Sequence, residues 1–343
     1  MKLGFLRPLY EDYGDYVSVY LDASRAAEDA IHAIELRWRS ARERLAADGA
    51  DQATLETVAS AVTDPANAAP GIAVFARHGT VAMRARLRVA PRHEIARFAA
   101  LPHVLPMLAQ RPPRVPHLRV TASPAGGEIL AVTATGRIID EWRIHGGWPP
   151  PDAGWDACAR EIATHVTAAA TEVDAEQIVI AGDPRVSSTV LGYLKPALRE
   201  IAVALPTEVP ADSAAMAKAA EDITTTYSKR TVVSRFGTWH SRMADGTAVA
   251  GLAGTIAALA DGRAAEVFLA DDPSSNTAAW TGPGGTELAL ASQTLTARGI
   301  DAPVRDRADA AIARAIACTD AELFFLPDDV EPPAGGIAAT LRY

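Results

Sequence analysis

The stretch from residue 128 to residue 183 most constrains the fold, because it contains a segment that neither a helix nor a central strand can absorb. That segment is residues 145–151, HGGWPPP, in which two glycines allow positive φ and three prolines remove backbone donors. Before it, two short β-type runs flank Gly136, which predicts a hairpin. After it, the sequence predicts a helix over about 155–173 and a buried strand over 177–183. This order holds an exposed, stiff loop out from a packed domain, an arrangement that often carries function.

The whole chain, at 343 residues, is longer than one ordinary core and predicts two or three domains. A proline-rich stretch at 111–116 is typical of a linker and ends the first domain near residue 115. We therefore expect a mixed α/β chain of three consecutive domains. They are residues 1–115, residues 116–240 with the glycine loop, and residues 241–343, whose alternating helices and strands predict a small α/β sandwich.

Several further elements follow from local periodicity. Alternating residues predict strands over 16–22 and 80–89, and a helical pattern runs from about residue 211 to near Gly237. Residues 335–343 predict a closing strand. Ser187 or its neighbour is expected to cap the helix that follows the buried strand, since serine is a preferred N-cap residue.

The charge balance and the cysteines limit the class of protein. With 33 basic and 42 acidic residues, the chain has a net charge of −9. This charge argues against a protein that binds nucleic acid through a wholly basic surface, and it gives no support for DNA as a partner. Cys158 and Cys318 are far apart in helix-like contexts, which argues against a disulfide framework and favours a reducing compartment. The start resembles no signal peptide, and no stretch is apolar enough to span a bilayer. We expect a cytoplasmic protein without a membrane partner.

One local basic cluster nevertheless stands out in this acidic chain. Residues 77–97 hold six arginines and two histidines, opposed only by Glu94. Within the expected strand, Arg84, Arg86 and Arg88 share one face because side chains alternate with period two. Two interpretations stay open: solvated charge that protects an edge strand from pairing, or contacts to RNA phosphates.

Sequence motifs give no catalytic centre. The chain contains no GxGxxG that opens a helix after a strand, and no GxxxxGK[ST], HExxH or GxSxG motif. None of the eight histidines has metal-ligand spacing with a cysteine or a carboxylate partner. His145 is a candidate acid or base, although exposure beside the glycine pair is the simpler interpretation. We predict no catalytic residue, no metal and no cofactor.

Taken together, four segments resemble the archaeo-eukaryotic class I release factors and their relative Pelota in order and spacing. They are residues 17–22, the hairpin-loop-helix-strand stretch ending at 182, residues 247–272 and residues 335–343. The chain is more closely similar to the bacterial branch of that family, which includes the Balon-type ribosome hibernation factors of actinobacteria. The resemblance covers nearly the whole chain, more weakly over 30–110, and implies a release-factor-like middle domain.

One departure from the family pattern bears on mechanism. Release factors carry Gly-Gly-Gln at the loop tip, whereas here Gly146 and Gly147 are followed by Trp148. Tryptophan has one N–H donor and no acceptor, so it cannot reproduce the hydrogen bonds of the glutamine amide to the attacking water. Peptide release is therefore not expected. The first domain also has no Asn-Ile-Lys-Ser motif, so stop-codon reading is not expected either.

The resemblance implies a non-catalytic, ribosome-associated hibernation or stress factor that occupies the A site. The middle-domain loop would face the peptidyl-transferase centre through His145, Gly146, Gly147 and Trp148. Elongation factor Tu is an implied partner. The candidate contacts to ribosomal RNA are Arg84, Arg86, Arg88, Lys229 and Arg230.

Two alternatives stay open. One is a peptidyl-tRNA hydrolase or ribosome rescue factor that uses His145 or a bound water in place of the glutamine. The other is a protein–protein adaptor that kept the fold and lost RNA binding.

Overall fold

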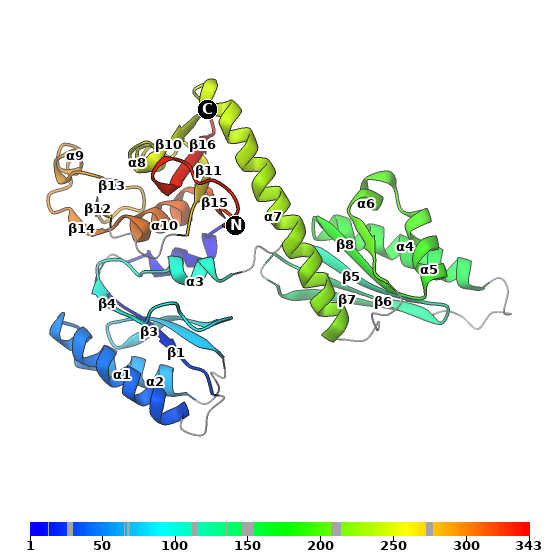
Figure 1. Cartoon of the computed structure of the whole chain (residues 1–343), viewed down its shortest axis with the longest axis horizontal. Helices are drawn as coiled ribbons and strands as arrows, with labels where there is room; N and C mark the ends of the chain where they lie inside the picture. The colour runs from blue at the N-terminus through cyan, green and yellow to red at the C-terminus, as the bar shows by residue number, and fades with distance from the viewer. Residues whose placement is uncertain are drawn as a thin grey trace. The chain divides into compact units, whose positions relative to one another are not determined.

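The chain is a mixed α/β protein, and the class predicted from the sequence is confirmed. In the computed structural model the chain divides into two compact units (Figure 1). The first unit joins an N-terminal half, residues 1–111, to a C-terminal half, residues 232–343, and the second unit is residues 112–231. The first unit thus groups the first and third predicted domains, and the division into three domains stays a prediction. The structure describes residues 1–12, 14–25, 30–64, 66, 69–111, 115–134, 136–145, 154–206, 214–271 and 277–343.

The N-terminal half of the first unit is built on an antiparallel sheet with strand order β3-β2-β1-β4. Two helices cover one face of this sheet, where Val19 and Val74 pack with Trp38 and Leu55 (Figure 1). The elements are β1 (Tyr16–Asp22), α1 (Ala30–Ala47), α2 (Gln52–Thr63), β2 (Gly71–Arg77), β3 (Thr80–Leu87) and β4 (Ile95–Ala99).

The opposite face of that sheet is buried against other parts of the same unit. Tyr20 and Phe75 lie in one apolar cluster with residues of η1 (Gly4–Leu9), α3 (Leu105–Ala109) and α10 (Ala308–Thr319). Because the sheet is covered on both faces, β1 and β2 are almost fully buried, although the alternating residues of β1 are typical of a strand with only one buried face.

The C-terminal half holds a four-stranded sheet in the order β10-β16-β11-β15, in which only β11 and β15 are parallel. A smaller sheet has the order β13-β12-β14. The strands are β10 (Ala248–Ala250), β11 (Ala264–Leu269), β12 (Ala278–Thr281), β13 (Leu288–Ala289), β14 (Val304–Arg307), β15 (Glu322–Phe325) and β16 (Ile337–Leu341). The helices are α8 (Gly251–Ala260), α9 (Ser292–Thr296), α10 and the 3-10 helix η3 (Ala334–Gly336).

The second unit is a five-stranded sheet in the order β7-β6-β5-β8-β9, with α4 and α5 packed on one face (Figure 1). On the other face, Met216 and Ala220 of the long helix α7 contact Val179 and Ala181. The elements are β5 (His117–Ser123), β6 (Gly126–Val132), β7 (Ile138–His145), α4 (Gly154–Glu172), β8 (Gln177–Gly182), α5 (Pro184–Tyr193), α6 (Pro196–Glu200), β9 (Ala202–Ala204) and α7 (Ala214–Ala244).

For this second unit the predicted types of element agree with the structure, whereas some predicted element ends and one capping residue differ. The predicted helix over 155–173 is α4, the buried strand is β8, and the hairpin turns at Gly136, whose φ is 80°. The capping prediction was wrong: Asp183 caps α5 by accepting from two backbone N–H groups, and Ser187 lies buried inside the helix. The long helix also continues past Gly237 to its end at residue 244, because Trp239 packs on the C-terminal sheet beyond the glycine.

Candidate functional site

The carboxyl edge of the second unit's sheet is the candidate site. Strands β5, β7 and β8 run in the same direction, so they end at this one edge, at Ser123, His145 and Gly182. Helix α5 follows β8 directly and begins at the same edge. In α/β sheets ligands bind outside the carboxyl ends of the strands, which makes this edge the place where chemistry is expected.

The predicted loop leaves the sheet at this edge, after β7. Gly146, Gly147 and Trp148 lie outside the described residues. His145 is described: it is the exposed last residue of β7 and is paired in register with Gly126 of the neighbouring strand. The structure therefore places the residue before Gly146 at the end of an edge strand.

Two glycines allow the backbones of neighbouring strands to approach closely beneath this edge. Gly182 has a φ of 122°, and a Cβ atom there would lie 2.1 Å from the Ala122 carbonyl oxygen. A Cβ atom on Gly127 would lie 2.4 Å from the carbonyl oxygen of Thr121. The Asp183 backbone N–H donates to the Ala122 carbonyl at 2.8 Å, which ties the end of β8 to β5. Only glycine permits these close approaches.

A surface cluster links the first turns of α4 to the end of α5. The Tyr193 hydroxyl donates to the carboxylate of Asp156, whose two oxygens lie 2.9 and 3.0 Å away. Arg160 donates to both partners at 3.0 Å, and its guanidinium lies 5.1 Å from the centre of the Tyr193 ring. The end of α5 is fixed further by Arg199, which donates to three backbone carbonyls there. Side-chain contacts thus tie the first turns of α4 to the end of α5.

The site shows no activated nucleophile in the part of the chain that is described. Burial raises the pKa of the Cys158 thiol, whose sulfur lies 3.6 Å from the Ser123 carbonyl oxygen, so the reactive thiolate is disfavoured at neutral pH. In the same described part, His145 has no carboxylate neighbour that would orient its ring for acid–base work.

The predicted basic cluster lies in the first unit, and two of its arginines turn toward α2. Arg84 faces Val74 and Arg86 faces Ile72 across the β2–β3 ladder, so both point to the face that the helices cover. Arg84 donates to the Asp64 carboxylate at 2.9 Å, and Arg86 donates to the Ala66 carbonyl at 2.6 Å.

Asp64 is the C-cap residue of α2, so these two cations lie at the negative end of the helix dipole. Hydrogen bonds from the Ala66 N–H and from Arg84 lower the pKa of Asp64. A structural role as helix C-terminal ligands therefore coexists with the predicted role in RNA contact. Arg88 is exposed in the bend after β3.

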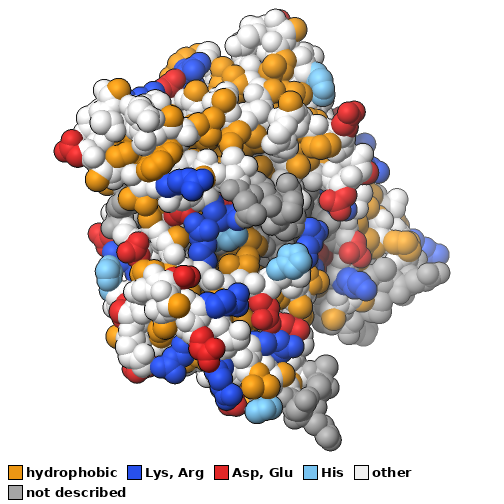
Figure 2. Space-filling model, turned by 60° about the vertical axis from the view of Figure 1, so that its left-hand side comes forward, with side chains coloured by type: hydrophobic (Ala, Val, Ile, Leu, Met, Phe, Trp, Pro, Cys, Tyr) orange, Lys and Arg blue, Asp and Glu red, His pale blue; other side chains and the backbone are white. Residues whose placement is uncertain are grey.

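Other arginines of the cluster are paired with acids from distant parts of the chain. Arg92 lies 3.6 Å from Asp271, and Arg97 pairs with Asp306. Figure 2 accordingly shows Lys and Arg side chains interspersed with Asp and Glu over the face that it displays. The local excess of positive charge in the sequence is therefore partly neutralised by folding.

The two remaining candidate RNA contacts, Lys229 and Arg230, are adjacent exposed residues of α7 in the second unit. Their exposure is compatible with the predicted contact, which stays a prediction.

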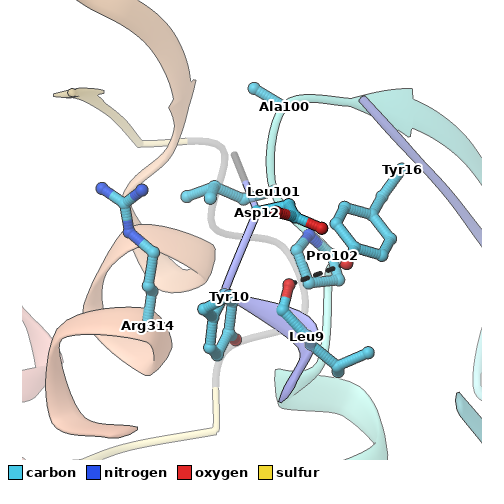
Figure 3. A pocket seen from close by; sticks show the side chains of 8 residues that line it. All are labelled: Leu9, Tyr10, Asp12, Tyr16, Ala100, Leu101, Pro102 and Arg314. Atoms are coloured by element: carbon cyan, nitrogen blue, oxygen red, sulfur yellow. Dashed lines mark hydrogen bonds between the residues drawn. The ribbon is translucent and has the colours of Figure 1, made fainter. Parts of the chain in front are cut away.

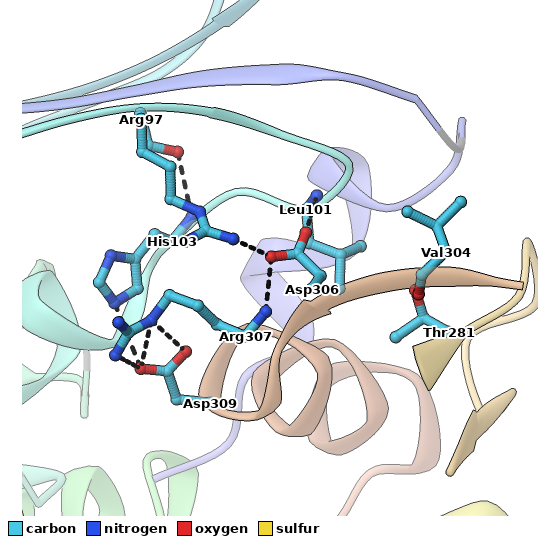
Figure 4. A network of polar contacts seen from close by, with 9 residues as sticks. Arg97, Leu101, His103, Thr281, Val304, Asp306, Arg307 and Asp309 are labelled. Atoms are coloured by element: carbon cyan, nitrogen blue, oxygen red, sulfur yellow. Dashed lines mark hydrogen bonds and ion pairs between the residues drawn. The ribbon is translucent and has the colours of Figure 1, made fainter. Parts of the chain in front are cut away.

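A polar network that the sequence did not indicate lies inside the first unit. Figure 4 shows Asp306 beside Arg97 and beside the backbone of Arg307. Three residues along, Asp309 accepts from Arg307 at 3.0 Å and lies 3.3 Å from His103 Nε2. No spacing signal could have found this network, because its partners are about two hundred residues apart in sequence.

Burial opposes ionisation of Asp309, but the hydrogen bonds from His103 and Arg307 prevail and hold the pKa of its carboxyl well below the ordinary range.

A hollow beside this network is too small for a substrate. It has about 170 Å³ of empty space, whereas ligand pockets hold roughly 300–1,000 Å³. Figure 3 shows Tyr16 donating to the Leu9 carbonyl at its wall, at 2.8 Å. Burial raises the pKa of Tyr10, which also lines the hollow, so this phenol stays neutral. The hollow is therefore not a candidate substrate site.

Within the described ranges, no helix combines the length and the apolar character that crossing a membrane requires.

Comparison with known proteins bears on the second unit most directly. Residues 150–238 match the model of bacterial archaeo-eukaryotic release factor family 2. This range starts within the predicted loop and ends inside α7, so it covers α4, β8, α5 and their neighbours. The match confirms the resemblance to the archaeo-eukaryotic release factors that the sequence predicted.

Similar proteins also extend over the full length. The chain is 26% identical over 369 residues to the uncharacterized protein Rv2629 of Mycobacterium tuberculosis (strain ATCC 25618 / H37Rv), covering 100% of this chain and 97% of the relative. A model of ribosome-bound archaeal Pelota and ABCE1 aligns over 99% of this chain and 94% of that chain, at 14% identity and a TM-score of 0.42. Archaeoglobus fulgidus Pelota aligns over 99% and 91%, at 14% identity and a TM-score of 0.37.

Proposed function

We propose that this chain, whose residues 150–238 match the model of bacterial archaeo-eukaryotic release factor family 2, is a non-catalytic translation factor that binds the ribosome. The observation that carries the proposal is this match, taken with the sequence at its border. The matched segment begins two residues after Trp148, which follows Gly146 and Gly147 at the place where the family resemblance implies a catalytic glutamine. A segment that resembles release factors but lacks the water-orienting amide supports ribosome binding without hydrolysis.

The finer proposal is a hibernation or stress factor that occupies the A site of idle ribosomes. His145, Gly146, Gly147 and Trp148 face the peptidyl-transferase centre in this proposal. The indole ring is suited to stacking on a base, which requires neither an acceptor nor a bound water. Exposure of His145 at the end of β7 supports a loop that leaves the domain at this point.

The RNA contacts proposed in the first unit are Arg84, Arg86 and Arg88, and those in the second are Lys229 and Arg230. The side chain of Arg84 is 41% exposed although it is paired with Asp64, so its guanidinium keeps donors free for a phosphate. Each phosphate contact makes binding weaker as the salt concentration rises. Elongation factor Tu is proposed as the delivering partner, on the strength of the family resemblance alone.

Co-sedimentation with vacant ribosomes through sucrose gradients tests the proposal. The full chain is run at low and at moderate salt, with and without elongation factor Tu. We expect it to migrate with ribosomes at low salt and to dissociate progressively as salt rises. Trp148→Ala is expected to weaken binding at both salt concentrations by a similar factor, because stacking depends little on salt.

Variants of the arginines separate RNA contact from a structural role. We expect Arg84→Gln with Arg86→Gln to lower both affinity and its salt dependence, and Arg84→Lys with Arg86→Lys to keep most of the affinity. Arg39→Gln with Arg44→Gln, on exposed positions of α1, is the matched control for charge. Equal loss in the control and the test variant would show that no specific contact exists. Absence of ribosome binding under every condition would leave the adaptor alternative.

The enzyme alternative has its own test. Peptide release from stalled ribosome complexes is measured with the wild type, His145→Ala and Trp148→Ala. The proposal expects no release above background in all three. Release that His145→Ala abolishes would establish a hydrolase or rescue factor instead.

A further inference from the structure

Residues 1–111 and 232–343 contribute side chains to one shared hydrophobic cluster. Tyr20, Phe75 and Leu87 of the N-terminal sheet lie in one buried cluster with Ile312 and Ile316 of α10. All five side chains are at most 3% exposed. Cores of this kind hold a domain together, whereas interfaces between separate domains are more polar and more hydrated.

Four ion pairs between described residues of these two halves have the same polarity. Each of the four takes its base from the N-terminal half and its acid from the C-terminal half. The pairs are Arg7–Asp320 at 2.8 Å, Arg92–Asp271 at 3.6 Å, Arg97–Asp306, and His103–Asp309 at 3.3 Å. This charge complementarity favours one way of packing the two halves together. A shifted arrangement would leave buried carboxylates without donors.

Asp306 is the most deeply buried acid of these four ion pairs. Its side chain is 1% exposed, and its carboxylate accepts from the Arg97 guanidinium, from the Leu101 N–H at 2.9 Å and from the Arg307 N–H at 2.6 Å. Two of these three donors belong to the N-terminal half. A buried carboxylate is stable only when its donors are present, so in the folded unit Asp306 depends on residues 97 and 101 for two of its three donors.

The sheet of the C-terminal half also uses the start of the chain. Lys2 forms a β-bridge with Glu322, and the Leu323 N–H donates to the Met1 carbonyl at 2.9 Å. Backbone groups at the edge strand β15 are thereby paired by residues of the other half. The dependence runs in both directions: each half completes the hydrogen bonding of the other.

We propose that residues 1–111 and 232–343 are one discontinuous, cooperatively folding domain, into which residues 112–231 are inserted, and that Asp306 locks its two halves together. The inserted unit has its own core around Ile129, Ile162 and Ile178. The proposal is independent of the proposed function, since it concerns only which parts of the chain fold together.

Cleavage of the full chain tests it. A site for a specific protease is introduced between Arg111 and Val115, the folded protein is cut, and gel filtration follows at about micromolar concentration in low and in 1 M salt. We expect fragment 1–111 to stay with the remainder under both conditions, because the interface is mostly apolar. With Asp306→Asn the fragment is expected to dissociate at least tenfold faster, whereas Asp320→Asn, in an exposed pair, leaves the rate unchanged.

Separation of the wild-type fragments would overturn the proposal. Retention with equal rates in both variants would overturn the role of Asp306. Hydrogen exchange on the uncut wild type gives a second measurement that needs no inserted site. Amides of β1 and of α10 are expected to exchange with the same free energy of opening, and a clearly lower value for either would show two separate domains.

Discussion

Replacing Asp306 by asparagine is the sharpest test of the forces inside the first unit. The amide has nearly the shape of the carboxylate, so packing is preserved while the charge is lost. One oxygen acceptor becomes an NH₂ group that faces existing N–H donors, and Arg97 loses its partner. Removing one partner of a buried pair costs roughly 3–5 kcal/mol. Because the Arg97 side chain is 30% exposed and water can screen it, we take the low end, about 3 kcal/mol.

The expected shift in melting temperature follows from the size of the unit. For a unit of roughly 200 residues, 1 kcal/mol lowers Tm by about 2–4 °C, so Asp306→Asn should lower it by roughly 6–12 °C. Calorimetry measures the shift, and hydrogen exchange locates it: the Leu101 amide, which donates to Asp306, should lose protection first.

Asp320→Asn is the matched control. It removes the same charge from a pair whose side chains are 48% and 70% exposed, and such surface pairs contribute about 0–1 kcal/mol. If Asp306→Asn melted within 1–2 °C of Asp320→Asn, the buried carboxylate would contribute no more than a surface one. Its three donors would then add no stability beyond that of an exposed pair.

Three further changes have defined outcomes. Gly182→Ala places a methyl group 2.1 Å from the Ala122 carbonyl oxygen at a φ of 122°. We therefore expect the free energy of unfolding, measured in urea, to fall by more than about 3 kcal/mol. A fall below about 1 kcal/mol would mean that the strands separate easily. Asp309 has a lowered pKa in the folded state, so its stabilisation is present above its ordinary pKa near 4 and is lost as pH falls toward the folded value. Unfolding free energy should therefore fall more steeply from pH 4 to pH 2 in the wild type than in Asp309→Asn, and parallel curves would contradict this. Tyr193→Phe removes the hydroxyl bonds to Asp156 but keeps the ring under Arg160; since the cluster is exposed, we expect less than about 1 kcal/mol by the same unfolding assay.

Two elements of the second unit, α4 and β8, were predictable because their signals are local. The sequence identified them to within a residue or two from the positions of glycine and proline, a 3.6-residue period and an apolar run bounded by turns. The face shared by Arg84 and Arg86 also followed from alternation along β3. The capping error has a local cause as well: Asp183 precedes Pro184, and a proline at the first helical position leaves the preceding residue as the cap.

The pairing of distant segments was not predictable. The partners of Arg92 and Arg97 are acids about two hundred residues away, and nothing in a single sequence links them. His103 was one of several scattered histidines until folding brought Asp309 to its ring. The basic cluster therefore looked more isolated in the sequence than it is in the folded unit. Side-chain periodicity identifies a face, but only the tertiary structure identifies what covers it.

The discontinuity of the first unit has a consequence for synthesis. Residues 1–111 leave the ribosome before α10, which packs in the same apolar cluster beside η1 and α3 and is made about two hundred residues later. At about 5–20 residues per second, the interval is roughly 10–40 s. During that time the apolar side chains of η1 and α3 that pack in this cluster lack α10, while residues 112–231 can already fold. A binder of exposed apolar segments, or a pause in elongation that lengthens the interval, would act on this chain at that stage.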